Sequence, residues 1–182
     1  IADFDRILEE QLTKLQTSYI DFYLLHALSR ERWEHIKEMN LLPHLKSVLD
    51  SGKVRRIGFS FHDDYEVFEE ILNAYDWDFC QIQFNYMDTE IQAGLRGYEL
   101  AKAKNIPMTI MEPVKGGMLA NVPEEIQAEF RRVHPDWSDA SWALRWVGGH
   151  DNVQTVLSGM STMEQVIDNV KTFSEIEPLN AE

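Results

Sequence analysis

Basic charge and cysteine are both scarce in this 182-residue chain, and each shortage excludes a class of function. The chain has 17 basic residues against 31 acidic ones, a formal net charge of −14. Nucleic-acid binding needs clustered Lys and Arg, and anionic lipid surfaces attract basic segments, so neither partner is expected. Cys80 is the only cysteine, which excludes an internal disulfide, a thiolate metal cage and a cysteine-held cluster within these residues.

Three other features are missing. No apolar run is long enough to span a bilayer, and no signal peptide stands at the start of the chain, so we expect a cytoplasmic protein. The first residue is Ile1 rather than Met, which leads us to expect a fragment of a longer chain. A Gly-x-Gly-x-x-Gly turn after a strand, which a Rossmann sheet would need, does not occur.

The chain does contain a repeated alternation of apolar strands and amphipathic helices. An amphipathic helix is predicted at Ala2–Thr17, and five strands follow it, at Tyr19–His26, Val54–Ser60, Phe79–Asn85, Pro107–Met111 and Val153–Leu157. Strands that alternate with helices imply a parallel sheet with right-handed crossovers. We therefore predict an α/β fold, a (β/α)8 TIM barrel, of which this chain supplies about five strand-helix units.

His26 is the first candidate for chemistry, because it stands at the end of the first predicted strand. In a barrel of alternating strands and helices, catalytic side chains lie where the strands end. The alternative is that His26 is structural, as a lone His beside apolar residues more often is. Its position alone favours that alternative.

Glycines follow the last two predicted strands, Gly116 and Gly117 after the fourth and Gly159 after the fifth. In a barrel, these loops often bind phosphate with the help of a helix N-terminus. Ser161 and Glu164 have the spacing of a capping box. The helix predicted from Thr162 is therefore expected to offer free N–H groups to an anion. Alternatively, the glycines only permit tight turns.

Four segments resemble the C-terminal part of an aldo-keto reductase, in the right order and spacing. They are Tyr19–His26, Gly52–Ser60, Gln81–Asn85 and Met160–Asn169. The resemblance implies that residues 1–182 form the C-terminal part of a single barrel domain, strands 4 to 8, without the N-terminal strands. Three segments further resemble a bacterial and archaeal subgroup whose full-length members often carry a C-terminal iron–sulfur segment: Ile57–His62, Glu112–Gly117 and Ser158–Gln165.

The resemblance also implies an activity. Aldo-keto reductases transfer hydride between NADP or NAD and a carbonyl carbon, which would make this an NAD(P)H-dependent oxidoreductase of small aldehydes or ketones. The family uses Asp, Tyr, Lys and His, and only His26 matches this set, as the residue that polarises the carbonyl. Because the other three lie upstream in the family, the chain as supplied is expected to be inactive.

Two alternatives stay beside this prediction. One is a non-catalytic regulatory subunit that binds a nicotinamide cofactor, as some relatives do. The other is a metal hydrolase using His26, His62 and Asp63, since His and carboxylates at strand ends can bind Zn²⁺. The hydrolase is disfavoured because no short His-spaced ligand motif occurs, and no metal site is predicted.

The cofactor's nicotinamide and pyrophosphate are assigned by the same resemblance. The carboxamide would be held by Ser60 and Gln81, and such bonds fix which ring face meets the substrate. The pyrophosphate loop would comprise Glu112, Pro113, Val114 and Gly116. The family commonly has Ser in place of Glu112, and a carboxylate beside pyrophosphate is unfavourable unless it points away. The backbone at Gly116 is therefore the stronger prediction.

The adenosine end departs from the family pattern. Members that prefer NADP place Lys and Arg at the 2′-phosphate, since Arg matches phosphate with a bidentate fork. The aligned positions here are Gly159, Met160 and Gln165, so we predict weak discrimination for NADPH and use of NADH as well. Asp168 and Asn169 resemble the acidic-Asn pair that contacts the adenine.

Overall fold

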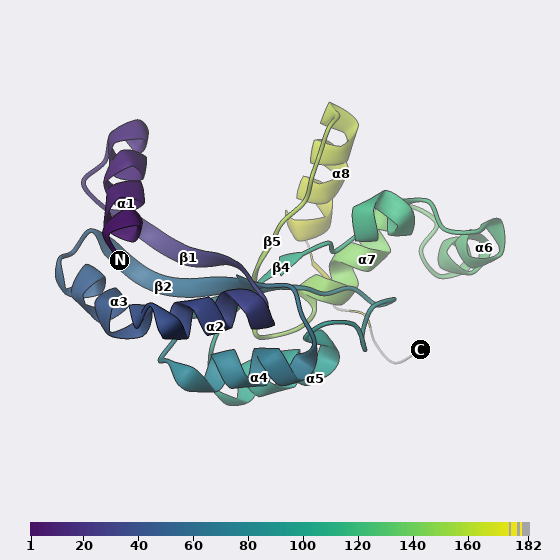
Figure 1. Cartoon of the computed structure of the whole chain (residues 1–182). Helices are drawn as coiled ribbons and strands as arrows, with labels where there is room; N and C mark the ends of the chain where they lie inside the picture. The colour runs from purple at the N-terminus through teal and green to yellow at the C-terminus, as the bar shows by residue number, and fades with distance from the viewer. Residues whose placement is uncertain (175, 178, 180–182) are drawn as a thin grey trace. The chain divides into compact units, whose positions relative to one another are not determined.

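A computed structural model describes residues 1–174, 176–177 and 179, and the chain divides into two compact units, Ile1–Gln81 and Ile82–Glu182. Figure 1 labels most of the helices and strands of both units. The five strands follow one another in the sheet in chain order, β1-β2-β3-β4-β5. Over the described residues, no helix is both long and apolar enough to cross a membrane.

The first unit packs helices against the parallel strands β1 and β2. Its elements are α1 (Ala2–Leu15), β1 (Ile20–Leu28), α2 (Arg30–Glu38), α3 (Leu41–Asp50), β2 (Val54–Phe61), α4 (Tyr65–Ala74) and the start of β3 (Phe79–Gln83). The apolar face of α4 is buried, and the ring of Phe68 lies 5.9 Å from Phe59 and 5.2 Å from Phe61 of β2. These rings fill the layer between helix and sheet and so hold the carboxyl end of β2 in place.

The second unit repeats the pattern with shorter strands. It contains the end of β3, α5 (Gly94–Ala103), β4 (Met108–Met111), the 3₁₀ helix η1 (Lys115–Ala120), α6 (Glu124–Val133), α7 (Asp139–Gly148), β5 (Val153–Val156) and α8 (Met163–Ser174). β4 and β5 pair in parallel, with Ile110 opposite Val156. Beyond β3, Phe84 is buried among the rings of Tyr98, Trp146 and His150 at 4.8–5.6 Å.

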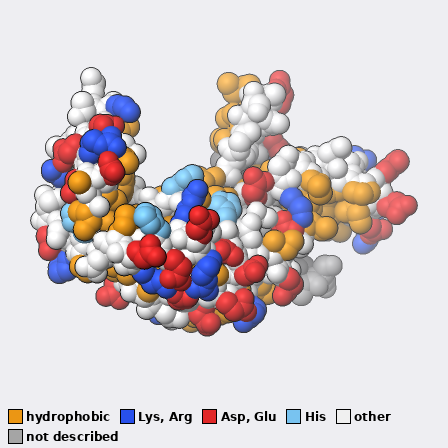
Figure 2. Space-filling model, viewed as in Figure 1, with side chains coloured by type: hydrophobic (Ala, Val, Ile, Leu, Met, Phe, Trp, Pro, Cys, Tyr) orange, Lys and Arg blue, Asp and Glu red, His pale blue; other side chains and the backbone are white. Residues whose placement is uncertain are grey.

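One face of α8 remains apolar and exposed, and Figure 2 shows hydrophobic side chains along this helix. Met163, Ile167, Val170 and Phe173 are 41–67% exposed. Their spacing of three to four residues is that of a helix face that normally packs against a neighbour. The described residues of this unit therefore leave the outer face of α8 uncovered.

The predicted α/β fold is confirmed, as a partial barrel of five parallel strands with intervening helices. The observed strand ends differ from the predicted ones by one or two residues. The strand β1 continues to Leu28. The strand β3 stops at Gln83, because the side chain of Asn85 accepts from the N–H of Asp88 and turns the chain there. The helix α2 was not predicted, since its only buried residues are Trp33 and Ile36. The assignment of residues 1–182 to a single domain stays a prediction.

Candidate cofactor and catalytic site

His26 lies at an irregularity near the end of β1. The pairing of β1 with β2 shifts there, and Ala27 has a φ of +54°, in the left-handed region. The N–H of Ala27 donates to Ser60 Oγ at 2.7 Å. On the other side, Arg32 Nη1 donates to the carbonyl oxygens of His26 at 3.1 Å and Ala27 at 3.0 Å. A bulge re-aims side chains at a strand end, and the side chain of His26 is exposed.

Ser60 and Gln81 are direct partners on the neighbouring strands β2 and β3. Ser60 is enclosed, at 1% exposed, whereas Gln81 is half-buried. A hydroxyl has one donor and two acceptor positions. Because Ser60 Oγ already accepts the Ala27 N–H, its own hydrogen can still be donated to a carboxamide oxygen. The first unit thus holds His26 and Ser60 near the ends of β1 and β2, and Gln81 in the middle of the neighbouring strand β3.

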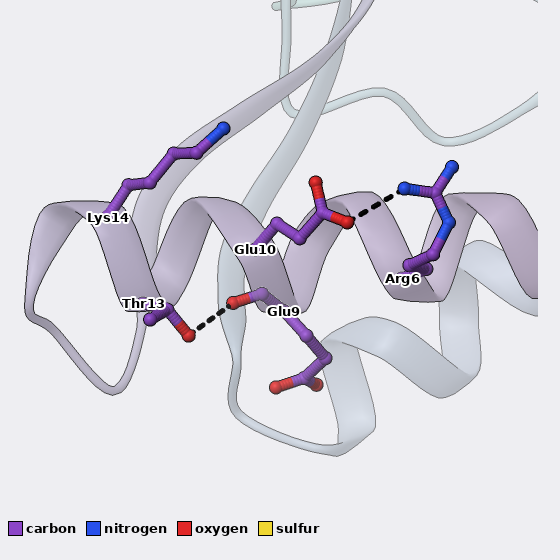
Figure 3. Close-up of a pocket in the computed structure, with 5 residues that line it drawn as sticks. All are labelled: Arg6, Glu9, Glu10, Thr13 and Lys14. Carbon is purple, nitrogen blue, oxygen red and sulfur yellow. Dashed lines mark hydrogen bonds and ion pairs between the residues drawn. The ribbon is translucent and has the colours of Figure 1, made fainter.

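The first unit has a hollow on β1 and another on α1. One, of about 300 Å³, lies beside β1 and is lined by His26 together with Leu25, Leu28 and Arg32, among others. The other lies on α1 alone (Figure 3) and is lined by Arg6, Glu9, Glu10, Thr13 and Lys14. Its polar groups bond to each other, Arg6 to Glu10 at 2.8 Å and Thr13 to the Glu9 carbonyl at 2.9 Å, and none of the predicted site residues lies there. We assign no ligand to the hollow on α1.

In the second unit, the loop after β4 has an unusual backbone. Glu112, Lys115, Gly116 and Gly117 all have positive φ, between 50° and 93°. Such values are routine for Gly and uncommon for other residues. The tight turn expected of the two glycines is therefore present. The N–H of Gly116 donates to Glu112 Oε2 at 2.6 Å, so the carboxylate points into the loop and not away from it.

A buried ion pair braces this loop. Lys115 Nζ contacts the carboxylate of Asp88, which is 2% exposed and also accepts from Gln83 at 3.0 Å and Asn85 at 3.2 Å. Asn85 Nδ2 donates in addition to the carbonyl oxygen of Glu112 at 3.1 Å. Burial by itself would raise the pKa of Asp88, but the bonds from Lys115 and Asn85 outweigh it, and the pKa is lowered.

Asp88 and Lys115 are residues that the sequence reasoning missed. A local signal existed, because Asn85 Oδ1 accepts from the N–H groups of Met87 at 3.1 Å and Asp88 at 3.0 Å. This is an Asx turn, which the order Asn-x-x-Asp after a strand could have indicated. The partner Lys115 lies 27 residues further along the chain, and no local pattern connects the two.

The loop after β5 covers its N–H groups mainly with uncharged side chains, and the exposed carboxylate of Glu164 has its pKa lowered by hydrogen bonds from its own N–H and from Thr162. Gln165 Oε1 accepts from the N–H groups of Ser161 at 2.7 Å and Thr162 at 3.2 Å, and Thr162 Oγ1 accepts from the N–H of Gln165 at 3.3 Å. The predicted capping box at Ser161 and Glu164 is wrong by one residue, because α8 begins at Met163 and the hydroxyl of the preceding Thr162 accepts from the N–H of Gln165. The helix start was also expected to offer free N–H groups. This expectation is wrong for Ser161, Thr162 and Gln165, whose N–H groups are all bonded. Gly159 and Met160, which precede them, are exposed.

The two predicted adenine contacts are both bonded within the second unit. Asp168 Oδ2 accepts from Ser138 Oγ at 2.6 Å, and Asn169 Nδ2 donates to Ser158 Oγ at 2.8 Å. Ser138 also caps α7, since its Oγ accepts from the N–H of Ser141 at 3.0 Å. Asp168 and Asn169 therefore tie α8 to the start of α7 and to the end of β5, and their contact with adenine stays a prediction.

A metal centre has no support among residues 1–174, 176–177 and 179, where no three His, Cys, Asp or Glu side chains are grouped to hold an ion. Asp63, one ligand of the alternative hydrolase site, accepts instead from the N–H groups of Arg30 at 2.6 Å and Asp64 at 2.8 Å. Cys80 is buried, which raises the pKa of its thiol and keeps it protonated.

Parallel strands alternating with helices, with polar side chains and glycine loops at the strand ends, define a protein of the TIM-barrel class. The model of the aldo/keto reductase family matches residues 2–182. The chain therefore belongs to the aldo-keto reductase family.

Solved structures agree with this fold. The chain is similar to aldo-keto reductase AKR11C1 from Bacillus halodurans in its holo form, with a TM-score of 0.79, 23% identity, and coverage of 99% of this chain and 61% of that one. It is also similar to an aldo/keto reductase from Klebsiella pneumoniae in complex with NADP and acetate, with a TM-score of 0.77, 22% identity, and coverage of 100% and 62%. The chain thus spans about three fifths of these relatives. A comparison with curated proteins gave no significant match.

Proposed function

We propose that this chain belongs to an NAD(P)H-dependent oxidoreductase, which transfers hydride between a nicotinamide cofactor and the carbonyl carbon of a small aldehyde or ketone. The observation that carries the proposal is the irregularity at the end of β1, where His26 is exposed and the N–H of the next residue, Ala27, donates to Ser60, the strand partner of Gln81. Family membership supports oxidoreductase chemistry, and the Klebsiella relative was solved with NADP.

Each residue of the first unit then has a distinct task. When bound, the nicotinamide supplies the hydride. His26 donates a hydrogen bond to the carbonyl oxygen, which stabilises the negative charge that develops there. Ser60 donates its hydroxyl hydrogen to the carboxamide oxygen, and Gln81 completes the hydrogen bonding of the carboxamide. Ser60 and Arg32 also hold the bulge, so they position His26 through its own backbone.

The rest of the cofactor is assigned to the second unit. We propose that the pyrophosphate lies on the loop of Glu112, Pro113, Val114 and Gly116, with the Gly116 N–H, which here donates to Glu112, as its donor once the carboxylate has moved. Gly159, Met160 and Gln165 would surround the adenosine 2′-position, and Asp168 and Asn169 the adenine. Uncharged groups at the 2′-position favour neither a phosphate nor a hydroxyl strongly, which supports the use of both NADPH and NADH.

His26→Gln is the direct test of this function. The family's proton donor lies upstream of the matched strands, so the test uses the protein in a form extended on the N-terminal side. We expect the variant to lose about a hundredfold or more in kcat with a reactive aldehyde, because one oxyanion donor is misplaced. Cofactor affinity, followed by tryptophan fluorescence, should stay within about twofold, since His26 is assigned to the substrate. His35→Gln, an exposed His on α2 that lines the same hollow, is the comparison variant, and it should keep its kcat if the effect belongs to His26 and not to the hollow as a whole.

The outcomes separate the alternatives. Cofactor binding without turnover in the extended protein would favour a regulatory subunit over an enzyme. If the 182-residue chain alone reduced the aldehyde well above the uncatalysed rate, the assignment of the proton donor to an upstream residue would be wrong. Full activity in His26→Gln would remove His26 from the reaction.

A further inference from the structure

The loop after β4 carries an anion of its own. Gly116 donates its N–H to Glu112 Oε2 at 2.6 Å, and a Cβ placed at Gly116 would lie 3.9 Å from the same oxygen. Successive backbone N–H groups in a turn can form a concave site for an anion. The carboxylate of Glu112 therefore lies where such a loop would receive a phosphate oxygen.

The backbone of Glu112 is held while its side chain is not. Its carbonyl oxygen accepts from Asn85 Nδ2 and from the N–H of Lys115, both at 3.1 Å. The side chain is exposed and has the Gly116 N–H as its contact in this loop. Rotation about side-chain bonds is therefore enough to remove the carboxylate, and the loop itself need not move.

The one lysine of this loop does not offset the charge of Glu112. Lys115 Nζ contacts Asp88, and this carboxylate is 2% exposed and holds two further hydrogen bonds. Withdrawing Lys115 toward a phosphate would leave a buried carboxylate without its cation, which is strongly unfavourable. The loop consequently presents the negative charge of Glu112 to an incoming pyrophosphate, while its own lysine is already paired with Asp88.

We infer that Glu112 competes with the cofactor pyrophosphate for the Gly116 N–H and so lowers the affinity for NADPH and NADH alike. The inference rests on the proposed function, because it concerns the same cofactor. Glu112 would therefore not bind the cofactor. Its carboxylate must leave the Gly116 N–H before the dinucleotide can bind there. A residue without charge at position 112 should bind the cofactor more tightly.

The test compares Glu112→Ser and Glu112→Gln with the unaltered chain, using calorimetric titration with NADPH, NADH and ADP. Glu112→Ser should tighten binding of all three ligands by about fivefold, the effect of removing one screened charge near an anion. Glu112→Gln removes the charge but keeps an acceptor for Gly116, so it should gain about twofold. Glu125→Ser, an exposed Glu in the first turn of α6, controls for net charge and should change nothing.

A second readout needs no cofactor. The amide resonance of Gly116 should move upfield in Glu112→Ser, because its hydrogen bond to a carboxylate is lost, while the thermal unfolding curve stays the same. If the Gly116 resonance did not move, or if Glu112→Ser bound the three ligands no more tightly than the unaltered chain, the inference would be overturned. Should Glu112→Ser not fold, the comparison of Glu112→Gln with the unaltered chain decides. A last outcome separates the two proposals. If neither the unaltered chain nor a variant bound NADPH, NADH or ADP while the Gly116 amide resonance still moved, the proposed function and the competition would both be wrong. Only the hydrogen bond between Glu112 and Gly116 would be supported.

Discussion

The loops after β4 and β5 both follow short parallel strands and both contain glycine, yet they cover their N–H groups with different chemistry. The β4 loop uses the carboxylate of Glu112 and is braced by a buried ion pair. The β5 loop uses the amide oxygen of Gln165 and the hydroxyl of Thr162, both exposed. The first loop is therefore braced by an ion pair and carries a carboxylate on its amide, and the second is capped mainly by exposed uncharged groups, next to the exposed carboxylate of Glu164. Glycine content alone does not reveal this difference.

The largest expected effect concerns the brace of the β4 loop. Asp88→Asn keeps the size of the side chain but leaves Lys115 without a counterion. We expect the free energy of unfolding to fall by about 2 kcal/mol, less than for a fully buried pair because Lys115 is partly exposed. Urea denaturation measures it. Glu129→Gln, which breaks an exposed pair with Arg132, should have little effect. Equal losses in both variants would show that the β4 loop is no more rigid than the surface.

The stability difference between the unaltered chain and Asp88→Asn should depend on pH in a definite direction. Because the pKa of Asp88 is lowered in the folded state, its contribution is present above the unfolded value of about 3.9 and is lost as the pH falls through the lower folded value. The stability gap between the unaltered chain and Asp88→Asn should therefore narrow below about pH 4. A gap that widened in acid would contradict the assigned charge on Asp88.

The next prediction adds a positive charge to the β5 loop. Gln165→Arg places a guanidinium at the predicted 2′-phosphate position and should raise the preference for NADPH over NADH by about tenfold, or 1.4 kcal/mol. The unaltered protein should discriminate by less than about a hundredfold, or 2.7 kcal/mol. Dissociation constants for both cofactors measure this. Gln154→Arg, at an exposed position of β5, adds the same charge as a control. If Gln154→Arg raised the preference for NADPH over NADH as much as Gln165→Arg, the effect would come from the added charge and not from the position of residue 165.

The smallest effect concerns the neutral cap itself. Thr162→Ala removes the N-cap oxygen of α8 and should lower the free energy of unfolding by about 1 kcal/mol. The neighbouring Ser161→Ala should be close to neutral, because its Oγ makes only a 3.5 Å contact with the carbonyl of Gly159. Thermal unfolding compares the two. A larger loss in Ser161→Ala would restore the capping box first predicted from the sequence.

Much of the fold was predictable because its signals are local. Apolar runs and helical spacing located all five strands and the helices α1 and α8, and β1 and β3 differ from prediction only near their ends. The capping box shows where a local signal becomes ambiguous. Ser161-x-x-Glu164 and Thr162-x-x-Gln165 both satisfy the motif, and only the start of α8 at Met163 distinguishes them.

The candidate site was predictable as a set of positions and not as a set of contacts. Ser60 and Gln81 were named without their direct pairing, and Ser60 without its bond to the Ala27 N–H 33 residues away. The direction of the Glu112 carboxylate could not be foreseen either. It depends on the positive φ at Glu112, Lys115 and Gly116, which brings Oε2 back to an amide four residues later.

The sequence by itself determined the parallel strand-helix order, the family and the strand-end location of His26, because hydrophobic periodicity and motif spacing are properties of short segments. Only the tertiary structure decided what the two glycine loops do with their N–H groups. That outcome depends on partners distant in the chain, above all Asp88 with Lys115 and Asn85 with Glu112. Hydrogen bonds and ion pairs act through distances of about 3 Å in space, and the separation of residues along the chain does not reveal which of them reach that distance.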